Sequence, residues 1–272
     1  MGQSTMTTDQ IAITLVQTEL VWEDPAANRD HMTGLLSGLA DTDLVVLPEM
    51  WSTGFSMASD RLAETMDGPT ITWMKAMADN LAVQVAGSVI IQEGDHRFNR
   101  FCIAYPGGDV SHYDKRHLFR MSGEHQHYAP GSSRQVFELN GFRVLPQVCY
   151  DLRFPVFMRN RRQQGSSSDE PYDLMIVVAN WPARRRHHWR TLLQARAIEN
   201  QCYVVGVNRI GVDGNNVEYC GDSLVVDYEG GLVADLQDSD VVQNVVISRT
   251  DMLAYQDGFP AWKDADDFDL TI

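Results

Sequence analysis

The sequence lacks any long hydrophobic run and is poor in basic side chains. Its longest apolar stretches, around residues 44–47, 83–91 and 174–179, fall well short of the roughly 18 residues that a membrane-spanning helix needs. The 272 residues carry 22 basic and 37 acidic side chains, which give a formal net charge of −15. Such a charge repels nucleic acid and anionic lipid. We therefore expect neither a nucleic-acid-binding protein nor a membrane protein.

Cysteine is also scarce, and the start of the chain lacks the pattern of a targeting signal. Residues 1–10 are polar and contain no basic region followed by an apolar one, so we expect a cytoplasmic protein. The four cysteines are widely spaced without a Cys-x-x-Cys pair, which argues against a zinc knuckle and a thioredoxin-type motif. Either all four are buried hydrophobes or one of them is chemically active: Cys102, Cys149, Cys202 and Cys220.

Short apolar runs rich in β-branched residues recur along the chain and predict about ten strands. They cover residues 11–16, 44–47, 83–91, 101–105, 135–139, 143–149, 174–179, 203–208, 223–227 and 241–247. Helical periodicity appears between several of them, over residues 25–40, 69–81, 154–164 and 183–200. The Gly107-Gly108 and Gly230-Gly231 pairs predict hairpins. This pattern is typical of an α/β protein with mixed sheets and helices on the sheet faces.

The two halves of the chain resemble one another. Asp43-Leu44 and Asp173-Leu174 each begin a strand-like run, and Trp51 and Trp181 follow the two aspartates at the same distance. Further strand-like runs precede both pairs at nearly the same offset. The pattern predicts a two-layer core with pseudo-twofold symmetry, although a chance similarity is the alternative. Because no low-complexity linker separates the halves, we expect one domain over residues 1–272, with a core of about residues 10–250 and a C-terminal tail over 251–272.

Three reactive side chains lie at the ends of strand-like runs. Glu49 ends one apolar run, Cys149 ends another, and Lys115 follows a short β-like segment before an irregular stretch rich in His and Gly. The carboxyl ends of strands are where α/β sheets build their sites. Singly, a strand-end Glu or Lys is usually a solvated rim residue, and an apolar Cys is usually an inert core residue. Together they supply a nucleophile, a proton carrier and a cation for amide hydrolysis.

The residues around these side chains resemble the three catalytic blocks of the nitrilase, or carbon-nitrogen hydrolase, superfamily. The blocks are Leu47-Pro48-Glu49, the segment 113–119 (YDKRHLF) and the segment 148–155 (VCYDLRFP). Supporting matches are residues 123–124, 179–182, 195–200 and 221–223, so the resemblance covers almost the entire chain. The 148–155 block with Arg153, the 179–182 block and the terminal 259–262 segment are most similar to the bacterial omega-amidase branch, which hydrolyses the terminal amide of 2-oxoglutaramate.

The resemblance implies a fold and a mechanism. The fold is a four-layer αββα sandwich with mixed sheets. Cys149 attacks the amide carbon, Glu49 carries the proton, and Lys115 together with the backbone N–H of Tyr150 receives the oxyanion. Glu124 corresponds to an additional glutamate that positions the lysine or the substrate; a plain loop carboxylate is the alternative. We also expect a helix that begins near Phe154 to favour the thiolate of the nucleophile.

Several neighbouring side chains are candidates for substrate binding. Phe119, Tyr150 and Trp181 each adjoin a catalytic block and either form the pocket wall or pack in the core. The remote carboxylate of an omega-amide needs a cation, for which Arg153 and Arg184 are candidates. A structural ion pair is the alternative role for Arg153, and a solvated helix start is the alternative for Arg184.

The remaining expectations concern partners and competing functions. The proposed chemistry needs no cofactor and no metal; His125 and His127 have ligand-like spacing, but nothing in the sequence completes a metal site. The resemblance implies a homodimer that acts on a small amide. Alternative activities are hydrolysis of deaminated glutathione, another small amide or a nitrile, and acyl transfer. A non-catalytic binding module is an alternative from another class.

Overall fold

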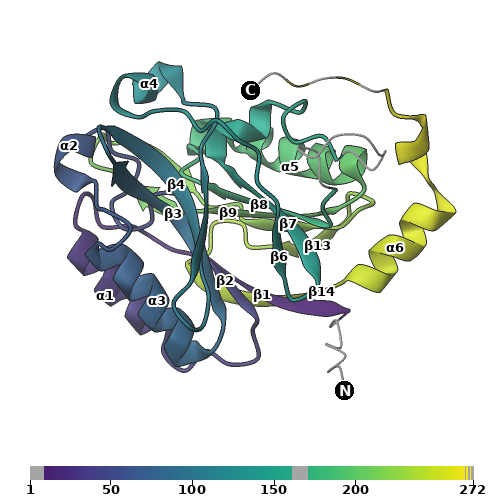
Figure 1. The fold of residues 1–272 in the computed structure, drawn as a ribbon, viewed down its shortest axis with the longest axis horizontal. Coiled ribbons are helices and arrows are strands. Elements are labelled where there is room, and N and C mark those ends of the chain that lie inside the picture. The colour runs from purple at the N-terminus through teal and green to yellow at the C-terminus, as the bar shows by residue number, and fades with distance from the viewer. Residues whose placement is uncertain (1–8, 161–170, 267, 269, 271–272) are drawn as a thin grey trace.

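Two six-stranded sheets lie face to face and form the centre of the molecule, with helices on their outer sides (Figure 1). The structure is a computed structural model that describes residues 9–160, 171–266, 268 and 270. The two sheets pack against each other through buried hydrophobic residues of both, which form one continuous cluster. The expected α/β sandwich with mixed sheets is thus confirmed.

The first sheet has a parallel centre and antiparallel edges. Strands β1, β2 and β3 are parallel neighbours, and β14 and β4 pair antiparallel on either side of them. The order across the sheet is β14 (Val241–Ser248), β1 (Gln10–Gln17), β2 (Leu44–Val46), β3 (Gln84–Glu93), β4 (His96–Ala104) and β5 (Val110–Asp114). The turn between β4 and β5 contains Gly107 and Gly108, as expected, and both have positive φ.

The second sheet repeats this arrangement. Its parallel centre is β7, β8 and β9, with β6 and β12 antiparallel on either side. The order is β6 (Phe137–Leu139), β7 (Phe142–Val148), β8 (Leu174–Ala179), β9 (Tyr203–Asn208), β12 (Leu224–Val226) and β13 (Leu232–Asp235). The two sheets therefore share one topology, which agrees with the pseudo-twofold symmetry expected from the sequence. A separate hairpin is formed by β10 (Ile210–Val212) and β11 (Glu218–Cys220).

Helices cover the outer face of each sheet. Helices α1 (Pro25–Leu36) and α3 (Pro69–Leu81) pack on the first sheet around a second buried cluster. Helix α5 (Arg186–Asn200) packs on the second sheet through Trp189 and Leu193, close to Gly206 of β9. The remaining helices are α2 (Ser59–Leu62), α4 (Glu124–His127) and α6 (Arg249–Gly258), with 3-10 turns η1 (Arg120–Ser122), η2 (Cys149–Arg153), η3 (Ala183–Arg185) and η4 (Ala261–Asp264).

Some helix predictions were wrong. No helix begins near Phe154: residues 155–158 form a turn, and residues 161–164 of the predicted helix lie outside the described residues. Phe154 precedes Pro155, and the residue before a proline is disfavoured in α conformation. Helix α1 ends before residue 40 because Gly38 adopts a positive φ of 75°. The expected tail instead contains helix α6 and the turn η4.

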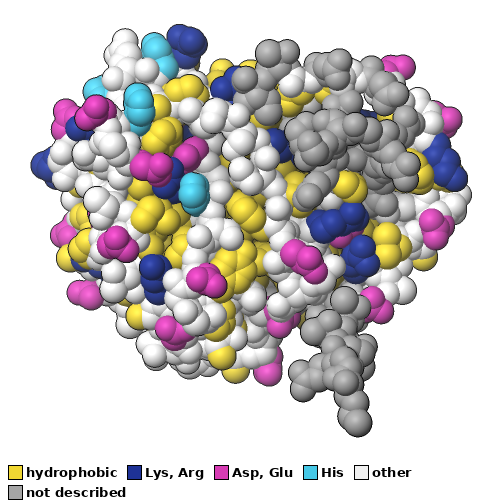
Figure 2. Space-filling view, in the orientation of Figure 1, with side chains coloured by type: hydrophobic (Ala, Val, Ile, Leu, Met, Phe, Trp, Pro, Cys, Tyr) yellow, Lys and Arg dark blue, Asp and Glu magenta, His cyan; other side chains and the backbone are white. Residues whose placement is uncertain are grey.

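The surface carries charges of both signs. On the face in Figure 2, Lys and Arg side chains are scattered among acidic ones, several of them side by side. None of the helices in the described part of the chain is both long and apolar enough to cross a membrane. Residues 1–8 of the polar start of the chain lie outside the described residues.

Candidate active site

Cys149 lies at the turn where β7 ends and the 3-10 helix η2 begins. Its backbone has a φ of 46°, in the left-handed region that a residue with a side chain rarely adopts. Asp151 holds the turn, because its carboxylate accepts from the backbone N–H of Val148 at 3.0 Å, from the Tyr113 hydroxyl and from the backbone N–H of His117. The turn thus fixes the thiol at the end of a strand.

Glu49 follows β2 and is completely buried. Its Oε1 accepts from Nζ of Lys115 at 2.9 Å and from Nδ2 of Asn99 at 2.7 Å. Its Oε2 accepts from the backbone N–H of Asn180 at 2.8 Å. Buried carboxylates are tolerated when they are paired and hydrogen-bonded in this way. The carboxylate is therefore held in one orientation by three donors from three different segments.

Lys115 follows β5, and its side chain is also fully buried. Its Nζ donates to Glu49 and to both carboxylate oxygens of Glu124, at 2.9 and 3.0 Å, and lies 5.2 Å from the centre of the Phe55 ring. Burial alone would lower the pKa of Lys115, but the two carboxylates outweigh it and raise this pKa. The lysine is therefore cationic throughout the physiological pH range.

Glu124 begins helix α4 and faces the same lysine. Burial and the neighbouring Glu49 charge raise the pKa of Glu124, while Lys115 and the backbone N–H of Phe119 act in the opposite direction. Two carboxylates and one ammonium group thus share a water-excluded volume. The structure brings together the four residues to which the sequence assigned catalysis: Glu49, Lys115, Glu124 and Cys149.

The environment of Cys149 differs from the expectation in one respect. Burial raises the pKa of the Cys149 thiol well above its ordinary 9.0, and the Glu49 carboxylate raises it further. Lys115 lowers this pKa but offsets only part of the increase. The helix that was expected to favour the thiolate is absent from residues 154–160. The prediction of a thiolate-stabilising helix was therefore wrong, and this environment favours the neutral form of the Cys149 thiol.

Two residues of the site had no role in the sequence analysis. Asn99 lies in the middle of β4 and donates to Glu49 at 2.7 Å and to Glu124 at 3.3 Å. Asn180 follows β8; its side chain also donates to the backbone carbonyl of Glu49, and its own carbonyl lies 4.0 Å from Sγ of Cys149. Asn180 belongs to a motif that the sequence analysis quoted, but a mid-strand asparagine such as Asn99 carries no local signal of its role.

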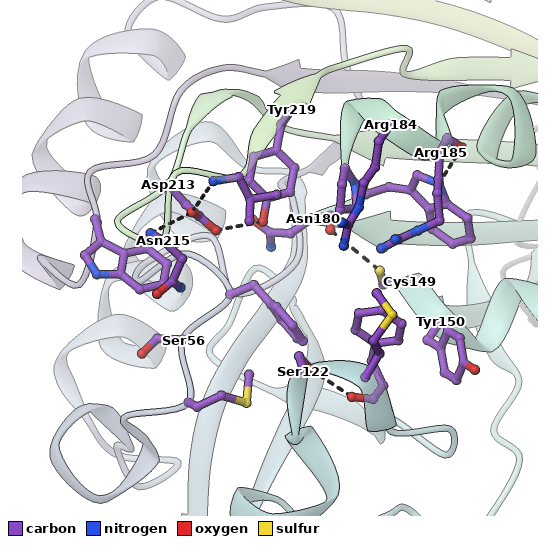
Figure 3. A pocket seen from close by; sticks show the side chains of 18 of the residues that line it. Ser56, Ser122, Cys149, Tyr150, Asn180, Arg184, Arg185, Asp213, Asn215 and Tyr219 are labelled. Atoms are coloured by element: carbon purple, nitrogen blue, oxygen red, sulfur yellow. Dashed lines mark hydrogen bonds between the residues drawn. The ribbon is translucent and has the colours of Figure 1, made fainter.

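Cys149 opens onto a pocket of about 480 Å³, a volume typical of small-molecule sites. In Figure 3, Asp213, Asn215 and Tyr219 lie on one side of the view and Arg184 and Arg185 on the side of Cys149. All five candidates for substrate binding line this pocket: Phe119, Tyr150, Arg153, Trp181 and Arg184. The first two rings lie 5.0 Å apart, which gives the pocket an aromatic wall.

The other cysteines lie elsewhere. Cys102 and Cys202 are buried, as expected, and burial raises the pKa of Cys102 to about 12. Cys220 is partly exposed and lies near Asp222, so the expectation that all four cysteines are buried does not hold for this residue. Burial and Asp222 raise the pKa of Cys220 to about 11. Across residues 9–160 and 171–266, no three His, Cys, Asp or Glu side chains gather as ligands for a metal ion.

Comparisons with known proteins agree with this arrangement. The family model for carbon-nitrogen hydrolases matches residues 12–253. The chain is 45% identical to omega-amidase YafV of Escherichia coli strain K12, over 96% of this chain and 98% of that protein. It is 34% identical to 2-oxoglutaramate amidase of Bacillus subtilis, over 82% and 84% of the two chains. The crystal structure of XC1258 from Xanthomonas campestris, a CN-hydrolase superfamily protein with an arsenic adduct in its active site, superposes with a TM-score of 0.92 at 46% identity, covering 96% of this chain and 99% of that one.

Proposed function

Because the chain belongs to the carbon-nitrogen hydrolase family, we propose that it is an omega-amidase that hydrolyses 2-oxoglutaramate to 2-oxoglutarate and ammonia. One observation carries the proposal: the Cys149 thiol lines a pocket of small-molecule size and interacts electrostatically with a buried lysine and two buried carboxylates that are hydrogen-bonded to one another. The near full-length similarity to an omega-amidase supports the choice of substrate.

In the first half-reaction, Cys149 attacks the amide carbon while Glu49 takes the thiol proton. Attack and proton transfer occur together, because the raised pKa of Cys149 disfavours a preformed thiolate. The developing oxyanion is received by the Lys115 ammonium and the backbone N–H of Tyr150. Loss of one such donor typically costs about 3 kcal/mol in the barrier. The intermediate collapses when Glu49 returns the proton to the nitrogen, so that ammonia leaves and a Cys149 thioester remains.

In the second half-reaction, Glu49 takes a proton from a water molecule as that water attacks the thioester carbon. The same cation and N–H group stabilise the second oxyanion. The carbon–sulfur bond then breaks, Glu49 returns the proton to the sulfur, and the carboxylic acid is released. Glu124 keeps Lys115 in position through the two hydrogen bonds it accepts from the ammonium group.

The aromatic wall of the pocket contacts the substrate chain. Phe119 and Tyr150 pack against each other beside the nucleophile, and Trp181 is held by a hydrogen bond from its backbone N–H to Asn208 at 2.8 Å. The Arg153 guanidinium lies 4.7 Å from the centre of the Trp181 ring and supplies positive charge to the pocket.

The test is ammonia release from 2-oxoglutaramate by the purified protein, alongside deaminated glutathione and a simple nitrile. We expect turnover of 2-oxoglutaramate to exceed that of both comparators and to vanish in Cys149→Ala. Cys220→Ala is the matched control, because Cys220 lies outside the pocket, and it is expected to retain activity. A preference for deaminated glutathione, or full activity of Cys149→Ala, would refute the proposal.

The protein also acts, in our proposal, as a cytoplasmic homodimer. Ile198 of α5 and Phe259 after α6 are 54% and 59% exposed. Ile198 adjoins the turn at Gly230, and the Phe259 ring lies near that of Tyr255, which in turn packs at a tilt against Tyr228. We propose that these exposed apolar side chains belong to the subunit interface, where such side chains are buried on association. Sedimentation equilibrium tests the oligomeric state, with Ile198→Glu expected to give monomers; cell fractionation tests the location.

A further inference from the structure

The peptide group that joins Glu49 to Met50 is held at both of its polar atoms. Its N–H donates to Oγ of Ser88 at 2.8 Å, and its carbonyl accepts from the side-chain amide of Asn180. Both partners are buried, and they come from different sheets: Ser88 lies on β3 of the first sheet, and Asn180 directly follows β8 of the second. The peptide plane is therefore fixed between the two sheets.

This peptide group determines the direction in which the Glu49 side chain leaves the backbone. A peptide group is planar, so hydrogen bonds to both its N–H and its carbonyl fix the rotation about the Cα–C bond of Glu49. The chain also enters this residue in a fixed direction, because β2 pairs with β3 and the backbone N–H of Leu47 donates to the carbonyl of Ala86 at 2.7 Å. The base of the Glu49 side chain is thus held as firmly as its carboxylate.

The chain leaves this peptide group in a conformation that Met50 does not favour. The φ of Met50 is 41°, in the left-handed region where a Cβ is sterically disfavoured. Such a conformation persists only where the surrounding structure holds it. Ser88 supplies two of the bonds that do so: its hydroxyl accepts from the N–H of Met50, and its backbone carbonyl accepts from the N–H of Trp51 at 3.3 Å. The bend directly after Glu49 therefore depends on Ser88.

We propose that Ser88 is a positioning residue for the reaction: its hydroxyl holds the Glu49–Met50 peptide group so that the Glu49 carboxylate keeps the orientation that proton transfer requires. Without the hydroxyl, the buried N–H of Met50 loses its hydrogen-bond partner, and the bend relaxes to satisfy it. Ser88 lies outside the pocket lining, so it acts through Glu49 and not through the substrate. This inference rests on the proposed function, in which Glu49 carries the proton.

The first test is steady-state kinetics of Ser88→Ala on 2-oxoglutaramate. We expect kcat to fall about 10- to 100-fold while KM stays within about threefold, because the variant disturbs the proton carrier and leaves the pocket lining intact. Ser88→Cys is similar in size to serine, but sulfur is a weak acceptor, so we expect a loss similar to that of Ser88→Ala. Full activity of Ser88→Cys, or a raised KM with an unchanged kcat in Ser88→Ala, would overturn the inference.

Ser59→Ala is the matched control. Ser59 is also buried, its hydroxyl donates to the backbone carbonyl of His127 at 3.2 Å, and it lies outside the pocket lining. We expect its kcat to stay within about threefold of the wild-type value, as for a substitution away from the reacting groups. An equal fall of kcat in Ser59→Ala and Ser88→Ala would indicate a general effect of losing a buried hydroxyl and would overturn the inference.

A second measurement needs no turnover and separates this inference from the proposed activity. Burial, Glu49 and Glu124 raise the pKa of Cys149, whereas Lys115 lowers it. When the Glu49 carboxylate is free to move away from the thiol, the thiolate forms at lower pH. We therefore expect the pH profile of Cys149 alkylation by iodoacetamide to shift toward lower pH in Ser88→Ala, by less than in Glu49→Gln.

The alkylation rates are measured in a Cys220→Ser background, because Cys220 is also partly exposed. In a Glu49→Gln background, Ser88→Ala should add no further shift, since its effect passes through the Glu49 charge. If the wild-type protein fails to hydrolyse 2-oxoglutaramate yet Ser88→Ala shifts the profile, the omega-amidase proposal fails and the positioning role stands. An unchanged profile in Ser88→Ala, or an equal shift in the Glu49→Gln background, refutes the positioning role.

Discussion

The side-chain amide of Asn99 bridges the two carboxylates of the site: Nδ2 lies 2.7 Å from Oε1 of Glu49 and 3.3 Å from Oε1 of Glu124. Lys115, which directly follows β5, bridges the same two carboxylates; β5 is the neighbour of β4, the strand that carries Asn99. A neutral donor and a cationic donor thus together fix the distance between the two carboxylates. Asn99 makes no contact with substrate in the proposed mechanism, so we regard it as a positioning residue.

Replacement of Asn99 by Ala should lower kcat more than it changes KM. The variant loses a hydrogen bond to a charged group, which is worth about 1.5–3 kcal/mol, so we expect kcat to fall roughly 10- to 100-fold. Steady-state kinetics on 2-oxoglutaramate measure both constants. Asn244→Ala is the control, because the Asn244 side chain bonds only a surface carbonyl of Asp41 in the described structure. A raised KM with an unchanged kcat would contradict a positioning role.

Replacement of Glu49 by Gln should make Cys149 react with iodoacetamide at lower pH, although turnover is lost. Burial and the Glu49 charge both raise the pKa of Cys149. Without that negative charge the thiolate forms more easily, so the alkylation profile shifts toward lower pH. Alkylation rates between pH 6 and 10 in a Cys220→Ser background test this. A shift to higher pH would show that Glu49 does not destabilise the thiolate.

Replacement of Lys115 by Met should destabilise the fold and abolish activity. The side chains of Lys115, Glu49 and Glu124 are all fully buried, and loss of the cation leaves two carboxylates uncompensated. Breaking such a cluster costs about 3–5 kcal/mol in the free energy of unfolding. Because Glu124 has a raised pKa in the fold, it takes up a proton readily in the variant, and the penalty is smaller at pH 5 than at pH 7.5.

Urea unfolding at the two pH values measures this penalty. Lys75→Met, on helix α3, is the control and should change stability by less than about 0.5 kcal/mol. A penalty that grows as the pH falls would contradict the assignment of the cost to ionised carboxylates.

Two glycine substitutions should have opposite effects on stability. In Gly87→Ala the new Cβ would lie 2.8 Å from Cδ1 of Trp51 and 2.9 Å from Cβ of Leu47, so β3 and the segment around Glu49 must move apart. Such overpacking costs about 1–3 kcal/mol. In Gly34→Ala, on helix α1, the Cβ meets nothing within 4 Å, and we expect a gain of roughly 0.5–1 kcal/mol. Thermal unfolding tests both; equal Tm values would contradict the packing argument.

The parallel centres of both sheets were predictable because their strands carry continuous apolar runs. The predicted strands 174–179 and 203–208 and the helix 69–81 match β8, β9 and α3 residue for residue. The prediction of a helix over residues 154–164 was wrong because side-chain contacts with distant parts of the chain hold the described part of this segment in a non-helical conformation. Phe154 stacks on His117 at 3.9 Å, and Asn160 bonds the backbone of Tyr172 and the side chain of Asn200. Such long-range contacts leave no periodic pattern in the sequence.

The site was predictable to the extent that its residues stand at strand ends. Glu49, Lys115 and Cys149 do so, and the motifs around them resemble those of a known family. Asn99 is different, because it points from the middle of β4, and only the three-dimensional packing of two carboxylates against this strand reveals what it does. Arg184 and Arg185 belong to a run of three arginines, and nothing in that run shows which of them line the pocket.

The hydrogen bonds between Asn180 and Glu49 join residues that follow the equivalent strands β8 and β2 of the two sheets. In the proposed mechanism, the proton carrier Glu49 therefore follows a strand of one sheet and the nucleophile Cys149 follows a strand of the other. If one sheet slipped past the other by a single residue, about 3.3 Å, the displacement would exceed the tolerance of a hydrogen bond. It would therefore separate the Glu49 carboxylate from the Cys149 thiol. The turnover rate therefore depends strongly on how the two sheets are aligned. Core substitutions far from the pocket that tilt one sheet will lower the turnover rate before they cause unfolding.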